Sequence, residues 1–302
     1  MQIPFRFLIE RRRYQNRLKS IVDVSNTLRL SGSIPRLAVC HVHFYEVWPD
    51  LVRALRNINP DEIWITTDCS NYEIEEMQLT FPNANIIRVE NRGRDAFPLV
   101  YLAQLGVFDK QSIVWKLHTK RSKQNLRGDL WRKELLFAVS GSRKIADYVY
   151  DCLTTKSVAM LGNDRYTVEL RAETIGEHFN LFSMWWKTNG KPAQTQPVKY
   201  IAGSIFACNS EVLLELKHLK LGQSQFFVEN SIGVGVGRIL AWKLYLLQFF
   251  QFSDSISARR IQLDATTRPL SQETCAIEPY LGSLAAIHGG TLGVFQASRD
   301  ED

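Results

Sequence analysis

Val114-Trp115-Lys116-Leu117-His118-Thr119-Lys120-Arg121-Ser122 is the stretch that most constrains the fold of this 302-residue chain. The apolar residues at its start are typical of the end of a buried strand. Because side chains alternate along a strand, we expect Lys116, His118 and Lys120 on one face. Ligands of open α/β sheets bind at the carboxyl ends of strands, and clustered ammonium and imidazolium groups suit a diphosphate. The stretch therefore predicts an anion site, with a solvated basic loop as the alternative.

A second basic cluster, Asn91-Arg92-Gly93-Arg94-Asp95, follows the predicted strand 85–89. Gly93 permits a tight turn, and the planar forks of the two arginines suit phosphate or carboxylate. Asp95 is expected to cap a helix that begins near Phe97 and Pro98. The alternative is a capped turn with solvated arginines, but a second basic cluster close by favours binding.

Strands and helices alternate around these two clusters. The pattern predicts strands at 37–44, 62–67, 85–89, 111–115, 157–161 and 199–208, and helices at 49–58, 72–81, 97–105, 129–153 and 211–219. Helices between successive strands indicate a parallel sheet with right-handed crossovers. The expected fold class is α/β: a mostly parallel, Rossmann-like sheet flanked by helices, with an aromatic-rich helical insert at 171–186.

The chain divides into three parts. Residues 1–35 are a basic amphipathic segment and a linker, residues 36–281 the α/β domain, and residues 282–302 a small-residue tail expected to be mobile. The first part predicts a helix that can lie on an anionic membrane surface, with Arg11, Arg12, Arg13, Arg17 and Lys19 beside Phe5, Leu8 and Ile9. The alternative is a helix packed on the domain with a solvated basic face.

Composition is that of a soluble globular protein, with 45% hydrophobic residues and a net charge of +6. Five scattered cysteines predict neither a disulfide framework nor a zinc site, and indicate a reducing cytoplasm. No apolar run is long enough to span a bilayer; the best, 239–250, is interrupted by Lys243. No secretory signal is expected. Without a recognised motif, the positive charge does not predict a nucleic-acid partner.

Six motifs in order resemble those of the rhamnan synthesis protein F family. They are Leu37-Ala38-Val39-Cys40-His41-Val42-His43-Phe44-Tyr45, Ile63-Trp64-Ile65-Thr66-Thr67-Asp68, Asn91-Arg92-Gly93-Arg94-Asp95, Lys116-Leu117-His118-Thr119-Lys120-Arg121-Ser122, Trp131-Arg132 and Ala202-Gly203-Ser204-Ile205-Phe206. The resemblance spans about residues 36–245. It implies a GT-A-like fold and a role in bacterial cell-surface polysaccharide assembly, O-antigen and lipopolysaccharide included, as a glycosyltransferase or glycosyltransferase-like protein.

In a GT-A-like fold the first strands hold the nucleotide, and an Asp-x-Asp element after the fourth strand normally binds a divalent metal. The resemblance puts Lys116-Leu117-His118 at that place, without paired carboxylates. We expect metal-independent transfer, in which fixed cations stabilise the departing diphosphate. The alternative is that the two strands do not correspond. No metal site and no cofactor are expected.

The candidate catalytic residues are Glu229, Asp95 and His118. An inverting transferase needs a general base, for which Glu229 is preferred over Asp95; the alternative for Glu229 is a carboxylate at a helix start. The candidate nucleotide-sugar ligands are His43, Asp68, Asn91, Arg92, Gly93, Arg94, Lys116, His118, Lys120, Gly203 and Arg238. Asp68 can accept from a ribose hydroxyl or base edge, or cap a turn. His41 shares a face with His43, but a buried histidine is the simpler interpretation.

The leading hypothesis is a cytoplasmic glycosyltransferase at the inner face of the plasma membrane. It would transfer a sugar, rhamnose by resemblance, from a nucleotide-sugar donor to a lipid-linked or oligosaccharide acceptor. Val234 and Gly237 stand where the resembled family commonly has His and Glu. The second hypothesis is therefore a catalytically silent protein that binds glycan or partner enzymes. A nucleic-acid-binding protein, supported by charge alone, is the third.

Overall fold

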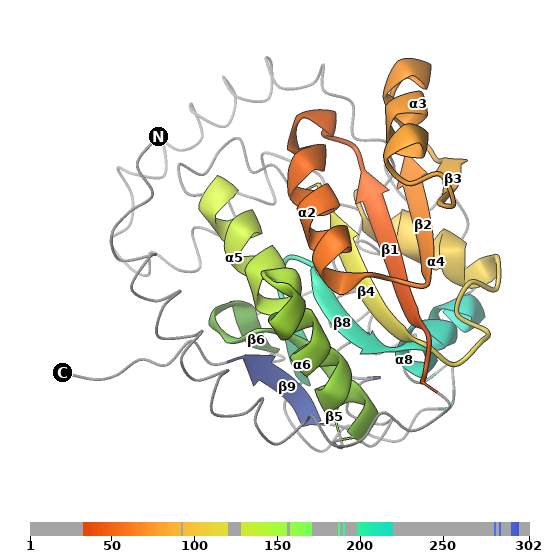
Figure 1. The fold of residues 1–302 in the computed structure, drawn as a ribbon. Helices are drawn as coiled ribbons and strands as arrows, with labels where there is room; N and C mark the ends of the chain where they lie inside the picture. The colour runs from red at the N-terminus through yellow and green to blue at the C-terminus, as the bar shows by residue number, and fades with distance from the viewer. Residues whose placement is uncertain are drawn as a thin grey trace, which may run out of the picture.

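A computed structural model describes most of the α/β part of the chain. The described residues are 33–91, 93–119, 128–155, 158–170, 187, 190, 198–219, 281, 284 and 291–295. They form one seven-stranded sheet with helices on both faces, and a separate two-stranded ribbon (Figure 1). None of the described helices has the length and apolar character that crossing a bilayer requires. The predicted insert at 171–186 and the N-terminal basic segment lie outside the described residues.

The sheet is mostly parallel, as predicted. Its strand order is β3-β2-β1-β4-β8-β5-β9. The strands are β1 (Arg36–Val42), β2 (Glu62–Thr67), β3 (Asn85–Arg88), β4 (Ile113–His118), β5 (Val158–Asn163), β8 (Phe206–Asn209) and β9 (Thr291–Phe295). The first four are parallel to one another, and β8 runs antiparallel to both β4 and β5. β9 pairs with β5 in parallel, so part of the segment expected to be a mobile tail is a strand.

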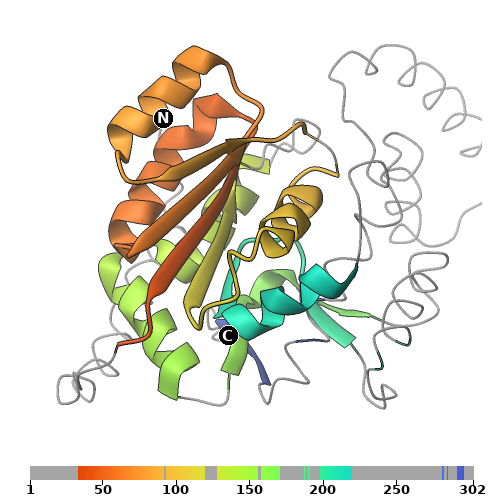
Figure 2. The ribbon, with the colours of Figure 1, turned by 90° about the vertical axis from the view of Figure 1, so that its right-hand side faces the viewer.

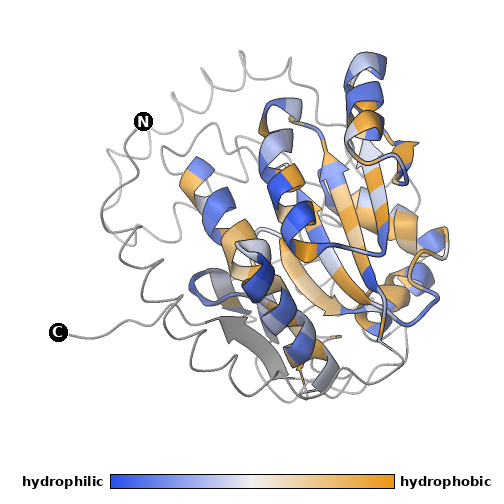
Figure 3. Ribbon diagram, viewed as in Figure 1, coloured by the Kyte–Doolittle hydropathy of each residue, from blue (hydrophilic) through white to orange (hydrophobic). Residues whose placement is uncertain are grey.

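Two layers of helices cover the sheet (Figure 2). One face carries α4 (Ala96–Gln104), α8 (Ser210–Leu214) and η4 (Glu215–Leu219). The other carries η1 (Tyr45–Val47), α2 (Trp48–Ile58), α3 (Asn71–Thr80), α5 (Gly128–Ser140) and α6 (Arg143–Thr155). Apolar residues of the central strands and the inward sides of the helices meet between these layers, while the outward sides of the helices are polar (Figure 3). This is the pattern that burial of apolar surface dictates for a three-layer α/β protein.

Local sequence explains where several elements begin and end. α2 has Pro49 in its first turn and buries Leu51, Leu55 and Ile58 at helical spacing, as predicted. α3 begins with a capping box between Ser70 and Glu73. The single helix predicted over 129–153 is two helices, α5 and α6, which are separated at residues 141–142.

Two strand predictions need correction. β4 extends to His118 rather than ending at Trp115, because Lys116 and His118 pair with Val39 and His41 of β1. The strand predicted over 199–208 is two strands, β7 (Val198–Ile201) and β8; β7 pairs with β6 (Thr167–Leu170) in the ribbon. The break falls at Gly203 and Ser204, whose φ angles of 96° and 51° are incompatible with a strand.

The strand order sets the position of the candidate site. From β1 the chain moves through β2 to β3 on one side, and then returns through α4 to β4 on the other side of β1. The carboxyl ends of β1 and β4 therefore flank a topological switch point, the place where open α/β sheets bind their ligands. The basic clusters that the sequence analysis identified follow β3 and include the end of β4, at this edge of the sheet.

Candidate functional site

Three charged side chains meet on the α4 face of the sheet, and we call Asp95, Lys116 and His118 the inner cluster. Asp95 lies immediately before α4, while Lys116 and His118 lie two residues apart on β4. The Asp95 carboxylate forms an ion pair with the Lys116 ammonium, and its second oxygen lies 3.1 Å from His118 Nδ1. Their side chains are 13%, 3% and 8% exposed, respectively. The cluster is thus almost closed to bulk water.

The hydrogen-bond partners of His118 show its charge. Nδ1 faces the Asp95 carboxylate, and Nε2 lies 2.9 Å from the carbonyl oxygen of Gly203. Both partners are acceptors when Asp95 is ionised, so both ring nitrogens donate and the ring is an imidazolium. Burial opposes ionisation of Asp95, but the charges and hydrogen bonds of His118 and Lys116 prevail and hold the pKa of this carboxyl well below its usual range. One anion and two cations leave the inner cluster with a net positive charge.

The turn before α4 aims Asp95 at β4. Gly93 and Arg94 have φ angles of 55° and 54°, so two successive residues are left-handed. Glycine adopts the left-handed conformation without a steric penalty, as expected for Gly93. In Arg94 the same left-handed conformation costs on the order of 1 kcal/mol. Asp95 stands at the N-cap position but makes no side-chain capping hydrogen bond. The expectation that Asp95 caps the helix is therefore wrong, because its carboxylate binds Lys116 and His118 instead.

Gly203 belongs to the same site through its backbone. Its carbonyl oxygen accepts a hydrogen bond from His118 Nε2. Its left-handed backbone conformation follows the end of β7. A Cβ atom at this position would lie 2.8 Å from a methyl carbon of Leu135 and 3.1 Å from the Trp131 ring, so both side chains would have to shift to admit it. The φ angle therefore requires glycine here, and the close packing adds to the cost of any side chain.

A second pair lies closer to the surface, and we call His43 and Asp68 the outer pair. They follow β1 and β2, and His43 Nδ1 lies 2.9 and 3.0 Å from the two carboxylate oxygens of Asp68. Their side chains are 29% and 28% exposed. The Thr119 hydroxyl accepts hydrogen bonds from the backbone N–H groups of His43 and Phe44, so it ties the end of β4 to the end of β1. Thr119 had no predicted role, although its place next to His118 was a usable signal.

The structure therefore brings together six of the predicted site residues, with Gly93 and Arg94 forming the adjoining turn. These six are His43, Asp68, Asp95, Lys116, His118 and Gly203. Asn91 is buried just before the turn. Arg92, Lys120, Glu229 and Arg238 lie outside the described residues. Within the described ranges, no group of His, Cys, Asp and Glu side chains has an arrangement that could hold a metal ion.

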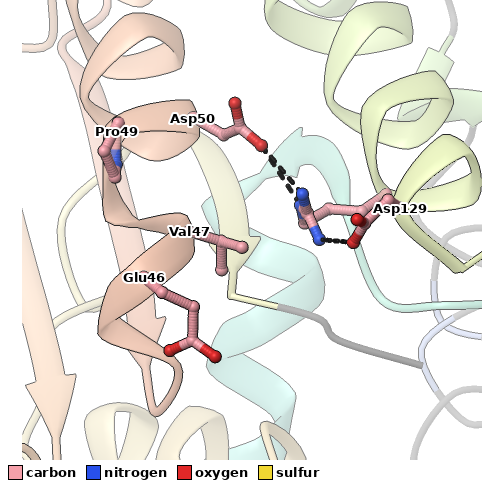
Figure 4. A pocket seen from close by; sticks show the side chains of 6 residues that line it. Glu46, Val47, Pro49, Asp50 and Asp129 are labelled. Atoms are coloured by element: carbon pink, nitrogen blue, oxygen red, sulfur yellow. Dashed lines mark hydrogen bonds and ion pairs between the residues drawn. The ribbon is translucent and has the colours of Figure 1, made fainter. Parts of the chain in front are cut away.

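A polar cavity of about 290 Å³ lies at the same edge of the sheet, between η1, the start of α2 and the start of α5 (Figure 4). Its polar lining consists of Glu46, Asp50, Asp129 and Arg132. The nearly buried Arg132 guanidinium pairs with Asp50 at 3.0 Å and with Asp129 at 2.8 Å (Figure 4). Arg132 thereby joins α5 to α2, and the lining holds three carboxylates for one guanidinium. Such a lining suits hydroxyl groups better than phosphate.

Comparisons with known proteins give two curated relatives and one family model. The chain is 28% identical over 196 residues to a protein named uncharacterized protein WxcX of Xanthomonas campestris pv. campestris strain ATCC 33913, and 27% identical to its counterpart in strain B100. Each match covers 64% of this chain and 28% of the relative, so the chain spans less than a third of the length of these curated relatives. The family model described as Rhamnan synthesis protein F matches residues 13–158. The resemblance to the rhamnan synthesis protein F family is thus confirmed over a segment that contains the inner cluster and the outer pair.

Proposed function

We propose that this protein is a glycosyltransferase that uses a nucleotide-sugar donor in cell-surface polysaccharide assembly. The family match implies involvement in rhamnan or related polysaccharide synthesis. The use of a nucleotide-sugar donor is inferred from the inner cluster. This cluster is buried, has a net positive charge and lies at the switch point of the mostly parallel sheet. A diphosphate is the anion that such a place favours, and nucleotide sugars carry one.

The chemistry of transfer explains why the cluster would matter. As the bond between the sugar and the diphosphate breaks, negative charge grows on the leaving oxygens. A lysine ammonium has three N–H donors, and Asp95 is the one hydrogen-bond partner recorded for Lys116 among the described residues. The remaining donors and the imidazolium of His118 would stabilise that charge without reorganisation, since Asp95 and Gly203 already hold both side chains in place.

The topology supports a GT-A-like fold in this proposal. The first four strands lie in the order β3-β2-β1-β4, which is the order of the first four strands of a Rossmann-like sheet. Lys116 and His118 then occupy the end of the fourth strand, where a GT-A-like enzyme would normally present carboxylates to a metal. The outer pair lies at the ends of β1 and β2, the side on which the nucleotide would be held.

The remaining parts of the proposal rest on sequence. Arg92, Arg94 and Lys120 would add positive charge around the diphosphate, and Arg238 would be a further ligand of the nucleotide sugar. Rhamnose is the proposed sugar and a lipid-linked or oligosaccharide glycan the proposed acceptor. The basic segment at 1–35 would hold the protein at the inner face of the plasma membrane, near such an acceptor.

Replacing Lys116 by Met should weaken the binding of nucleoside diphosphates by at least about tenfold, because it removes a cation and keeps the length of the side chain. Calorimetric titration with UDP, dTDP and GDP measures this. Lys217→Met is the matched control. The Lys217 ammonium forms an ion pair with Asp109 at 2.9 Å on the surface, outside the site. Equal affinity of the wild-type protein and folded Lys116→Met would sink the proposal.

Transfer should not require a divalent metal, because the inner cluster supplies fixed positive charge where the metal would act. Release of nucleoside diphosphate from the donor identified by titration should proceed at an unchanged rate in excess EDTA. Loss of turnover in EDTA, with recovery on adding Mn²⁺ or Mg²⁺, would contradict this prediction.

Glu229 is the preferred general base in this proposal. Asp95 is the weaker candidate, because two cations hold its carboxylate and depress its pKa, which lowers its basicity. Glu229→Gln should lower turnover about a hundredfold or more and leave donor affinity unchanged. Single-turnover rates and donor titrations of the same variant separate the two effects. Turnover at the wild-type rate would remove Glu229 from this role.

A further inference from the structure

His41 has a buried ring nitrogen without a hydrogen-bond partner in the described structure. Its side chain lies on β1 between Thr66 of β2 and His118 of β4, its neighbours in register. The residue is 5% exposed, and Nε2 has no hydrogen-bond partner among the described residues. An orphaned polar atom of this kind is uncommon in proteins and calls for a specific partner.

The neighbouring hydroxyl determines which ring nitrogen carries the proton. His41 Nδ1 lies 3.1 Å from Thr66 Oγ1. That hydroxyl has one proton, which it donates to the Cys40 carbonyl at 3.3 Å, so it accepts from His41. Nδ1 is therefore protonated, and Nε2 carries a lone pair. The orphaned atom is an acceptor that needs a donor.

The surroundings keep this ring neutral. Burial lowers the pKa of His41 to about 4, and the groups that also act on it are Asp95, His118, Asp68 and Lys116. The ring thus borders the inner cluster and the outer pair, but adds no charge to them near neutral pH. It is also a weak base, so proton abstraction from an acceptor is not its task.

We propose that His41 Nε2 accepts a hydrogen bond from a hydroxyl group of the sugar-bearing ligand that the inner cluster holds by its diphosphate. The inference rests on the proposed function and adds a specificity-determining residue to it. Ionised phosphate oxygens have no hydrogen to donate, whereas the hydroxyls of ribose and of the transferred sugar do. His41 would therefore not contribute to the binding of a bare diphosphate and would favour a hydroxyl-bearing one.

The test compares three kinds of probe on the wild-type protein, His41→Phe and His41→Gln. The probes are inorganic pyrophosphate, the nucleoside diphosphates UDP, dTDP and GDP, and the nucleotide sugars UDP-glucose, dTDP-rhamnose and GDP-mannose. Phe fills the space of the ring without an acceptor, while Gln keeps one. Calorimetric titration gives the affinities, and chemical denaturation at pH 7 gives the stability of each variant.

We expect His41→Phe to bind pyrophosphate as the wild-type protein does and to bind the preferred hydroxyl-bearing ligand at least about tenfold more weakly. His41→Gln should recover much of this loss. A loss that appears with the nucleoside diphosphate identifies a ribose hydroxyl, and one that appears only with the nucleotide sugar identifies the transferred sugar. His41→Phe should be no less stable than the wild-type protein, because it removes an unsatisfied polar group from the core.

Other results would overturn the inference. Unchanged affinity of His41→Phe for every probe would do so, and so would an equal loss for all probes in a destabilised variant, which would assign His41 a structural role. A wild-type protein that binds pyrophosphate but gains nothing from any hydroxyl-bearing probe would remove the role of His41 and leave the anion site intact. A wild-type protein that binds no probe would overturn the proposed function, and the inference with it.

Discussion

Replacing Asp95 by Asn should lower the free energy of unfolding by about 3–5 kcal/mol, because it leaves the Lys116 ammonium and the His118 ring without their counter-ion in a nearly closed site. The amide keeps the shape of the side chain, so loss of charge is the dominant change. Urea denaturation at pH 7, followed by circular dichroism, measures the effect. Asp109→Asn is the matched control: its partner Lys217 is 40% exposed, and the change should cost at most about 1 kcal/mol.

A double-mutant cycle assigns this loss to the ion pair. In Asp95→Asn/Lys116→Met both partners of the pair are gone, so one buried cation remains instead of two. The double variant should therefore be more stable than the sum of the two single changes predicts, by about 1 kcal/mol or more. Strict additivity would mean that the Asp95 and Lys116 side chains do not stabilise each other, and that Asp95 acts through His118 or the backbone turn instead.

The parts of the fold that the sequence predicted are those that follow from periodic burial. Four parallel strands separated by helices were expected, and β1 to β4 form the predicted half of the sheet. The end of β4 was missed because Lys116 and His118 interrupt the apolar run that identifies a buried strand. Only pairing with β1, together with Asp95 as a counter-ion, allows these polar residues to lie inside the sheet. β9 was missed because its strand depends on a partner far away in the sequence, β5.

The candidate site, too, was predicted from sequence only in part. Charge clustering identified Lys116, His118 and Asp95, but alternation along a strand says nothing about which charges neutralise one another. Asp95 was expected to cap a helix because its sequence context is typical of caps. The left-handed backbone of Gly93 and Arg94 directs it to β4 instead. The role of the Gly203 carbonyl and the unpartnered nitrogen of His41 depend on three-dimensional contacts that no local pattern encodes.

Acid should destabilise this protein between pH 6.5 and 4 through His41. The pKa of this ring falls from its usual 6.5 to about 4 on folding, chiefly because burial disfavours the charged form. The unfolded chain therefore takes up the proton at a higher pH than the folded protein does. The stabilisation is complete above pH 6.5 and decreases as the pH falls toward 4, by about 3 kcal/mol in all. Asp95, with its low pKa, loses its contribution only at still lower pH.

The difference between the wild-type protein and His41→Phe isolates this effect, because the other histidines titrate in both. Free energies of unfolding measured at pH 7.5, 6.5, 5.5 and 4.5 should decrease more steeply in the wild-type protein, so that the advantage of His41→Phe grows by about 1.4 kcal/mol for each pH unit below 6.5. Parallel profiles would show that His41 binds its proton equally well in the folded and unfolded chain. In that case the protonated ring would have access to water or to a hydrogen-bond acceptor, and it would not be the neutral acceptor that the site is proposed to use.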